Sequence, residues 1–191
     1  IVGSGGVLSH APRRQQSAKM LIDSFLPEGV TSLAVDSIFM MPQLGVMANI
    51  DKKDLSEQAR AAALEVFEKD CLIRLGTCIA PVGNFDGKKN ILKAELEYSN
   101  GKMKEVSLDH GEIVIIDADY DEINITLLPG NGVDVGGGIN EQIETKIYGG
   151  EVGIIFDGRG RPLSLDHDPK TRISDLNKWS KAFNEYPSLE K

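Results

Sequence analysis

The chain opens with Ile1-Val-Gly-Ser-Gly-Gly-Val-Leu-Ser-His-Ala-Pro12, the stretch that decides the fold of its first part. Two apolar residues are typical of the end of a buried strand, and the last residues are typical of a helix start. Between them, Gly3, Gly5 and Gly6 predict a turn whose backbone can approach a ligand closely. Free amides at a helix N-terminus suit phosphate or ribose oxygens, so a nucleotide site is one interpretation. A tight connection without a ligand is the other.

Composition and charge narrow the class of protein. The chain has 191 residues, 41% of them hydrophobic and 26% charged, which allows one domain or two small ones. A net charge of −8 argues against a nucleic-acid partner, and no apolar run approaches the ~20 residues of a membrane span. Cys71 and Cys78 are expected to be buried thiols in a reducing, cytoplasmic compartment. The chain starts inside an apolar strand without Met, so we expect a fragment.

Residues 1–70 predict the order β-α-β-α-α, the closing piece of an α/β domain. The segment 38–48 is apolar nearly all round, so we expect a deeply buried helix with Pro42 in its first turn. Asp36 ends the strand before it, where α/β folds place chemistry and where a partner or phosphate could be contacted. The alternative for Asp36 is a cap of the following helix.

Residues 71–168 have a different texture, with about seven short strands at close spacing and Asn100-Gly101 as a hairpin turn. This pattern predicts a small antiparallel β-barrel or sandwich. Residues 169–191 are expected to form a C-terminal helix that docks on one of the two domains. The fold class is therefore α/β plus all-β.

Two loops carry residues that could contact a ligand. Arg159 and Arg161 follow the last strand in a tight turn and could hold a phosphate or an acidic partner, or else pair with the chain's own carboxylates. The loop Asp134-Val-Gly-Gly-Gly-Ile139 is similar to a phosphate loop, but Ile139 replaces the hydroxyl residue, which favours a plain connection between strands. The three histidines are scattered, so no metal site is predicted, and no set of catalytic residues stands out.

Four stretches together resemble the C-terminal part of the family of MutL, the accessory protein of glutamate mutase. The resemblance runs over nearly the whole chain. The stretches are Ile1-Val-Gly-Ser-Gly-Gly-Val-Leu-Ser-His-Ala-Pro12, Leu33-Ala-Val-Asp-Ser-Ile-Phe-Met-Met-Pro-Gln-Leu-Gly45, Leu75-Gly-Thr-Cys-Ile-Ala-Pro-Val-Gly83 and Val152-Gly-Ile-Ile-Phe-Asp-Gly-Arg-Gly-Arg-Pro-Leu163.

The resemblance implies an actin-like (ribonuclease H-like) ATPase that acts as a chaperone-like reactivating factor for adenosylcobalamin-dependent mutases. Its partners would be the mutase subunits, and its ligand would be ATP with Mg²⁺. In that superfamily the glycine pair before a helix binds adenosine, which implies Gly5 and Gly6, with Val7, Ser9 and His10 lining the base or ribose. The motifs for the phosphates and Mg²⁺ are absent from these residues. We therefore expect this chain alone to be inactive and to bind ATP weakly or undetectably.

A function of another class fits the same sequence. The chain could be a non-enzymatic interaction module in which the β-rich part binds a partner protein. The glycine turn would then be only structural. Loops rich in glycine and arginine are compatible with both functions, and the sequence does not indicate an oligomeric state.

Overall fold

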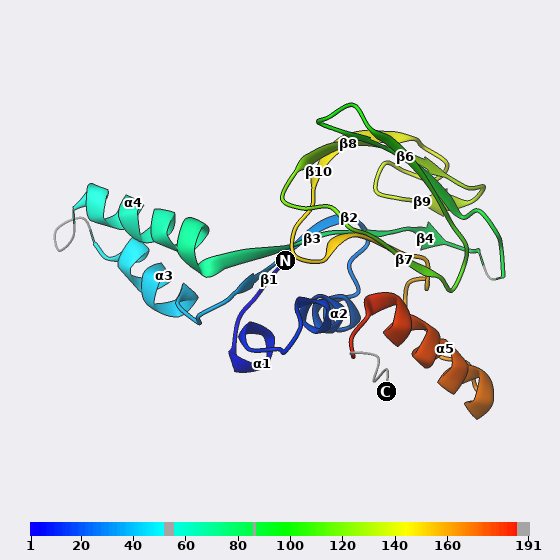
Figure 1. Ribbon diagram of the computed structural model, residues 1–191, viewed down its shortest axis with the longest axis horizontal. Coiled ribbons are helices and arrows are strands. Elements are labelled where there is room, and N and C mark those ends of the chain that lie inside the picture. Colours follow the sequence, from blue (N-terminus) through cyan, green and yellow to red (C-terminus); the bar gives the residue numbers. More distant parts are fainter. Residues whose placement is uncertain (52–55, 86, 187–191) are drawn as a thin grey trace.

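The computed structural model describes residues 1–51, 56–85 and 87–186. Its elements follow one another as β1 (Val2–Gly3), α1 (Gly6–Ser9), α2 (Arg14–Phe25), β2 (Gly29–Asp36), α3 (Met41–Asn49), α4 (Glu57–Val66), the π-helix η1 (Phe67–Cys71), β3 (Leu72–Ala80), β4 (Val82–Gly83), β5 (Leu92–Tyr98), β6 (Met103–Leu108), β7 (Ile113–Ile116), β8 (Glu122–Pro129), β9 (Val133–Asp134), β10 (Ile143–Tyr148), β11 (Gly153–Asp157) and α5 (Pro169–Phe183). Layers of helices and sheets stack on one another (Figure 1).

A five-stranded sheet forms the middle layer, in the order β1-β2-β3-β11-β7. The pairs β1–β2 and β3–β11 are parallel, whereas β2–β3 and β11–β7 are antiparallel. The sheet takes strands from both sides of residue 70. The α/β pattern of the first 70 residues and the β-rich region after them therefore share one sheet.

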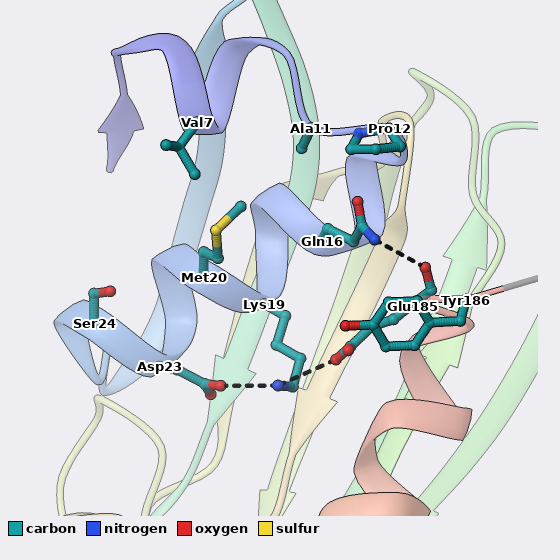
Figure 2. A pocket seen from close by; sticks show the side chains of 10 residues that line it. All are labelled: Val7, Ala11, Pro12, Gln16, Lys19, Met20, Asp23, Ser24, Glu185 and Tyr186. Carbon is teal, nitrogen blue, oxygen red and sulfur yellow. Dashed lines mark hydrogen bonds and ion pairs between the residues drawn. The ribbon is translucent and has the colours of Figure 1, made fainter.

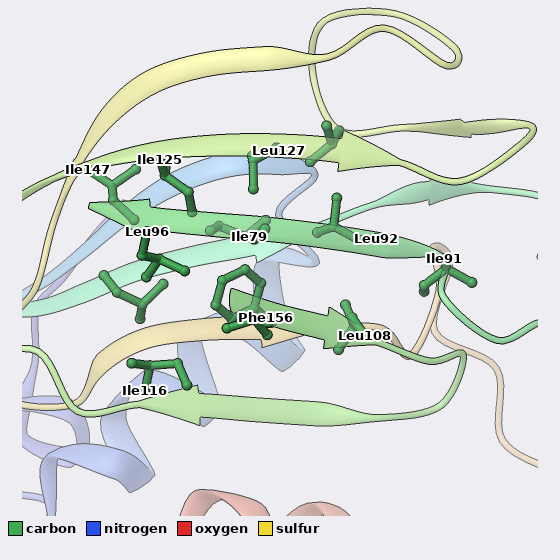
Figure 3. Packing of buried hydrophobic residues seen from close by; sticks show 14 of the residues in the cluster. Ile79, Ile91, Leu92, Leu96, Leu108, Ile116, Ile125, Leu127, Ile147 and Phe156 are labelled. Carbon is green, nitrogen blue, oxygen red and sulfur yellow. The ribbon is translucent and has the colours of Figure 1, made fainter. Parts of the chain in front are cut away.

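A four-stranded antiparallel sheet, β10-β8-β5-β6, packs on one face of this middle layer. Asn100-Gly101 connects β5 to β6, as the sequence predicts. Figure 3 shows the buried side chains between the sheets, among them Phe156 and Ile79 from one and Leu96 and Leu127 from the other. Two sheets pack face to face, as in the predicted sandwich. The predicted barrel is wrong, since within the described residues the sheets do not close on themselves. The reason is that β3 pairs with β2 on one side and β11 on the other.

Helices α2 and α5 cover the opposite face of the middle layer (Figure 1). Leu21 and Ile22 of α2 share a buried cluster with Trp179 and Phe183 of α5. The Trp179 indole N–H donates to the Gly111 carbonyl at 2.9 Å, so its polar atom is satisfied. The C-terminal helix therefore docks as predicted, but it ends at Phe183, before the predicted end. Residues 187–191 of that prediction lie outside the described part.

Helices α3 and α4 form a hairpin that projects from the end of the middle sheet (Figure 1). The α3–α4 hairpin has a core of its own, made of Leu44, Ala63 and Cys71. Pro42 lies in the first turn of α3, as predicted. The expectation of deep burial is wrong, because Val46 is 66% exposed. The helix packs on α4 and η1 rather than inside the sheet layers, so its outer side stays in solvent.

Among the described residues, no helix combines the length and apolar character needed to cross a membrane. Cys71 and Cys78 are both buried and free, in agreement with the sequence prediction.

Candidate functional site

The glycine turn connects β1 to the single helical turn α1. Gly3 has a packing role, because a Cβ there would lie 2.8 Å from Leu8 Cδ1 and 2.9 Å from Leu21 Cδ2. Gly5 has a φ of +112°, a value that residues with a side chain rarely adopt. The first amides to donate in the turn are those of Leu8 and Ser9, both to the Gly5 carbonyl. The amides of Gly6 and Val7 precede these donors and lie outside that bonding pattern.

Gly6 differs from its two glycine neighbours, because neither packing nor backbone conformation requires it. Nothing lies within 4 Å of a Cβ built at Gly6, and its φ is not in the left-handed region. The Val7 side chain is 74% exposed, and His10 is exposed as well. The turn therefore presents open backbone and two exposed side chains at one end of the sheet.

Ser9 and Asp36 attach this turn to the protein interior through hydrogen bonds. The Ser9 hydroxyl is buried and donates to the Asp36 backbone carbonyl, so it faces the protein interior. The Ser4 hydroxyl donates to Asp36 Oδ2 at 3.1 Å. The amides of Met40 and Met41 donate to the same carboxylate at 3.0 and 2.8 Å. Asp36 thus caps α3, the alternative we left open, and it also lies beside the glycine turn.

The hydrogen bonds to the Asp36 carboxylate lower its pKa by more than burial raises it. Burial alone would raise the pKa of this carboxyl, but the amides of Met41 and Met40 and the hydroxyl of Ser4 hold the pKa below its ordinary value of 3.8. A lowered folded-state pKa contributes stability that is present above 3.8 and is lost as the pH falls through the folded pKa.

We therefore expect the stability difference between wild type and Asp36→Asn to shrink on acidification. Urea unfolding at neutral pH and at a pH below 3.8 measures it. Asp117→Asn, which removes an exposed carboxylate, serves as the control for the substitution itself. A gap between wild type and Asp36→Asn that stays constant with pH would contradict the charged, hydrogen-bonded state of Asp36.

The arginine turn after β11 is tied to a buried aspartate. Arg159 Nε and Nη2 donate to the two oxygens of Asp157 at 2.9 and 2.8 Å, and Arg161 Nη2 donates to Asp157 Oδ2 at 2.9 Å. Arg159 also pairs with Asp23 at 2.8 Å and lies 5.1 Å above the Trp179 ring. Both arginine side chains are almost fully buried. Pairing with the chain's own carboxylates, one of our two interpretations, therefore describes this turn.

The polar groups of the loop at Asp134 also form hydrogen bonds within the loop. Asp134 Oδ1 accepts hydrogen bonds from the amides of Gly136 and Gly138 at 2.6 and 3.0 Å. Amides that could face an external phosphate thus face the loop's own carboxylate. In the described ranges, no group of three or more His, Cys, Asp or Glu side chains is arranged to hold a metal ion.

The arginine turn and the glycine turn contact different residues of α2. Arg14, at the start of α2, donates to the Ser9 carbonyl at 3.0 Å, whereas Arg159 contacts Asp23 near its end. The bonds of Arg159 and Arg161 go to Asp157, Asp23, Gly160 and Pro27, and none of these residues belongs to the glycine turn.

A cavity of about 510 Å³ lies beside the glycine turn, between α2 and the end of α5 (Figure 2). Val7 and Met20 contribute apolar surface to it. Lys19 lies between Asp23 and Glu185, at 3.3 and 3.1 Å. Sequence reasoning missed Lys19 and Glu185, because no local pattern relates residues so far apart in the chain.

Comparison with known proteins gives one match. Residues 1–71 match a family model described as MutL protein. No curated protein and no solved structure gives a significant match. The matched segment runs from β1 through η1, so it contains the glycine turn, Asp36 and the α3–α4 hairpin, whereas the arginine turn lies outside it. By this match, residues 1–71 of the chain are similar to the MutL protein family.

Proposed function

We propose that this chain is part of a chaperone-like ATPase that assists or reactivates an adenosylcobalamin-dependent glutamate mutase. The match of residues 1–71 to the MutL family supports an accessory function for glutamate mutase. In this proposal, the turn formed by residues 5–10 holds the adenosine part of ATP. The β-rich remainder of the chain senses the mutase.

The observation that carries the adenosine assignment is Gly6. Glycine in a helical position costs about 0.5–1 kcal/mol relative to alanine. Such a cost is usually offset by a left-handed φ or by a close neighbour, and Gly6 has neither. The approach of a ligand to the backbone is a physical reason for a glycine there.

The surroundings of Gly6 suit a nucleoside. The amides of Gly6 and Val7 can donate to ribose oxygens, and the exposed Val7 side chain offers apolar surface to a base. The exposed imidazole of His10 lies at the end of the same helical turn. Phosphate and Mg²⁺ groups would be held by segments outside these residues. ATP would then hold two lobes together through contacts that hydrolysis changes.

We expect adenosine to shift the backbone NMR signals of residues 5–10 in this chain, and Gly6→Asp to abolish these shifts. The added side chain would occupy the open space at Gly6, and its charge would oppose phosphate. Titrations with adenosine and ATP, followed by ¹H–¹⁵N spectra, measure the effect. Because the phosphate motifs are missing, ATP is expected to bind this chain little better than adenosine.

Gly45→Asp is the matched control. Gly45 also lies in a helix with nothing within 4 Å of a built Cβ, and the charge change is the same. We expect this variant to keep the shifts of residues 5–10. Equal responses in Gly6→Asp and wild type would remove the adenosine assignment, and sub-micromolar ATP affinity of the chain alone would contradict the missing phosphate contacts.

One observation favours the alternative, a non-enzymatic interaction module. The α3–α4 hairpin exposes Val46 (66%), Leu64 (52%) and Met47 (41%), which is unusual for a helix pair in solvent. The loops that suggested this function from the sequence, at Asp134 and Arg159, are instead tied to internal carboxylates. Absence of any adenosine response would leave the interaction module as the better reading.

A further inference from the structure

In the part of the hairpin that the structure describes, α3 and α4 are attached to the rest of the chain at their base. The hairpin packs on itself through Leu44, Ala63 and Cys71, apart from the two larger cores. Figure 1 shows it extending away from the sheet layers. An element with so small a separate core depends on the contacts at its base for its position.

Both chain segments at the base of the hairpin have irregular backbone. On one side, Phe39 has a φ of +59°, in the left-handed region that disfavours residues with a side chain. On the other side, the chain passes through the π-helix η1, a form often found at functional sites. Ser37 joins the two sides, because its amide and its hydroxyl each donate to the Cys71 carbonyl at 2.8 Å.

The Asp36 carboxylate connects this base to the glycine turn. Its Oδ2 accepts from both the Ser4 hydroxyl and the Met41 amide, while its Oδ1 accepts from the Met40 amide. The Asp36 carbonyl accepts from Ser9. Asp36 is fully buried, so competing water is excluded and these bonds depend on one another.

We propose that Asp36 is a positioning residue that couples the glycine turn to the α3–α4 hairpin, so that a nucleotide at the turn changes how firmly α3 is held. The part about the nucleotide rests on the proposed function. The coupling between turn and hairpin does not. Because one oxygen serves both elements, a movement of Ser4 redistributes the bonds that anchor the first turn of α3. Coupling of this kind is reciprocal, so loosening the first turn of α3 at Met40 and Met41 also alters affinity at the glycine turn.

Amide hydrogen exchange tests the coupling without any ligand. We expect Ser4→Ala to speed exchange at the amides of Met40, Met41 and Leu44 by about fivefold, the effect of one lost hydrogen bond. In an Asp36→Asn background the same change is expected to add nothing, because the shared carboxylate is gone. Ser17→Ala is the control. It removes a bond from α2 to the Leu8 carbonyl, beside the turn but without contact to Asp36, and is expected to leave those three amides unchanged.

Three results would overturn the coupling. They are unchanged exchange of the α3 amides in Ser4→Ala, the same acceleration in Ser17→Ala, and an undiminished effect of Ser4→Ala in the Asp36→Asn background. Should Asp36→Asn fail to fold, the comparison of Ser4→Ala with Ser17→Ala still decides.

Adenosine provides the second arm of the experiment. In wild type we expect it to alter exchange at Met40 and Met41. If Asp36→Asn shows NMR shifts at residues 5–10 without that change, the assignment of Asp36 stands. If adenosine shifts residues 5–10 in wild type and α3 exchange stays constant, the inference fails while the proposed function survives. If the NMR signals of residues 5–10 do not respond to adenosine, the proposed function fails. The coupling is then judged from the hydrogen exchange of Ser4→Ala alone.

Discussion

Replacing Asp157 with alanine is expected to lower the free energy of unfolding by about 3–5 kcal/mol, the range for breaking a buried ion pair by removing one partner. Asp157 is fully buried, and its two oxygens receive three hydrogen bonds from the side chains of Arg159 and Arg161 and a fourth from the Arg159 amide. Without Asp157, two nearly buried guanidinium groups lose their shared carboxylate. Arg159 keeps Asp23, and Arg161 keeps the Pro27 carbonyl at 3.0 Å, which limits the loss. Urea unfolding followed by circular dichroism measures it.

The control for Asp157 is Asp117→Ala, which removes an exposed carboxylate just after β7. Surface substitutions of this kind change stability by about 0.5 kcal/mol or less. A similar loss in both variants would show that the buried ion pairs have no special weight. Because Asp157 ends β11 and its arginine partners reach Asp23 and Pro27, the network also fixes α2 against the middle sheet. Its loss is therefore expected to loosen the helix that follows the glycine turn.

Local patterns in the sequence predicted local structure well. The hairpin at Asn100-Gly101, Pro42 in the first turn of α3 and the docking of Trp179 all follow from spacings of a few residues. In each case the signal is a turn type, a backbone restriction or a helical period, and neighbouring residues suffice to set it. The β-strands of the second half were found for the same reason.

Arrangements that join distant residues were not predictable in this way. The pairing of β3 with β11 brings Gly76 next to Gly153, and nothing in either strand indicates its partner. The seven short strands therefore suggested a barrel or a sandwich, and only the structure shows how they are divided between sheets. The same holds at the candidate site, where Asp36 carried two possible roles in the sequence. Only the three-dimensional arrangement shows that its carboxylate binds Ser4 and the start of α3 at once.

The exposure of α3 is a different kind of discrepancy. An apolar pattern nearly all round a helix predicts burial on every side. Among the residues that the structure describes, one side of α3 is covered, through Leu44 and Ala48. The apolar pattern favours burial of the whole helix surface, whereas the described part of the chain covers one side of it. The uncovered apolar side makes the attachment of the hairpin through Asp36 relevant to function.

Gly76→Ala is expected to have the second large effect, a loss of about 4 kcal/mol or more in the free energy of unfolding, or failure to fold. Gly76 has a φ of +137°, and a Cβ there would lie 1.8 Å from the Gly153 carbonyl oxygen. The Gly153 oxygen is a backbone atom, and the position of the added Cβ is fixed by the backbone of Gly76. Because both residues lie in the central pair β3–β11, neither atom can move aside without separating the strands. Thermal and urea unfolding measure the loss.

For Gly45→Ala, the same kind of substitution, we expect a stability change of the opposite sign. Gly45 lies in α3 with no atom within 4 Å of a built Cβ, so alanine is expected to stabilise the chain by about 0.5–1 kcal/mol. If Gly76→Ala were tolerated as well as Gly45→Ala, β3 and β11 could not be paired as observed. The consequence reaches the candidate site. β3 pairs with β2 of the matched segment on one side and with β11 on the other. A loss of the β3–β11 contact at Gly76 is therefore expected to weaken the strand that joins the matched segment to β11.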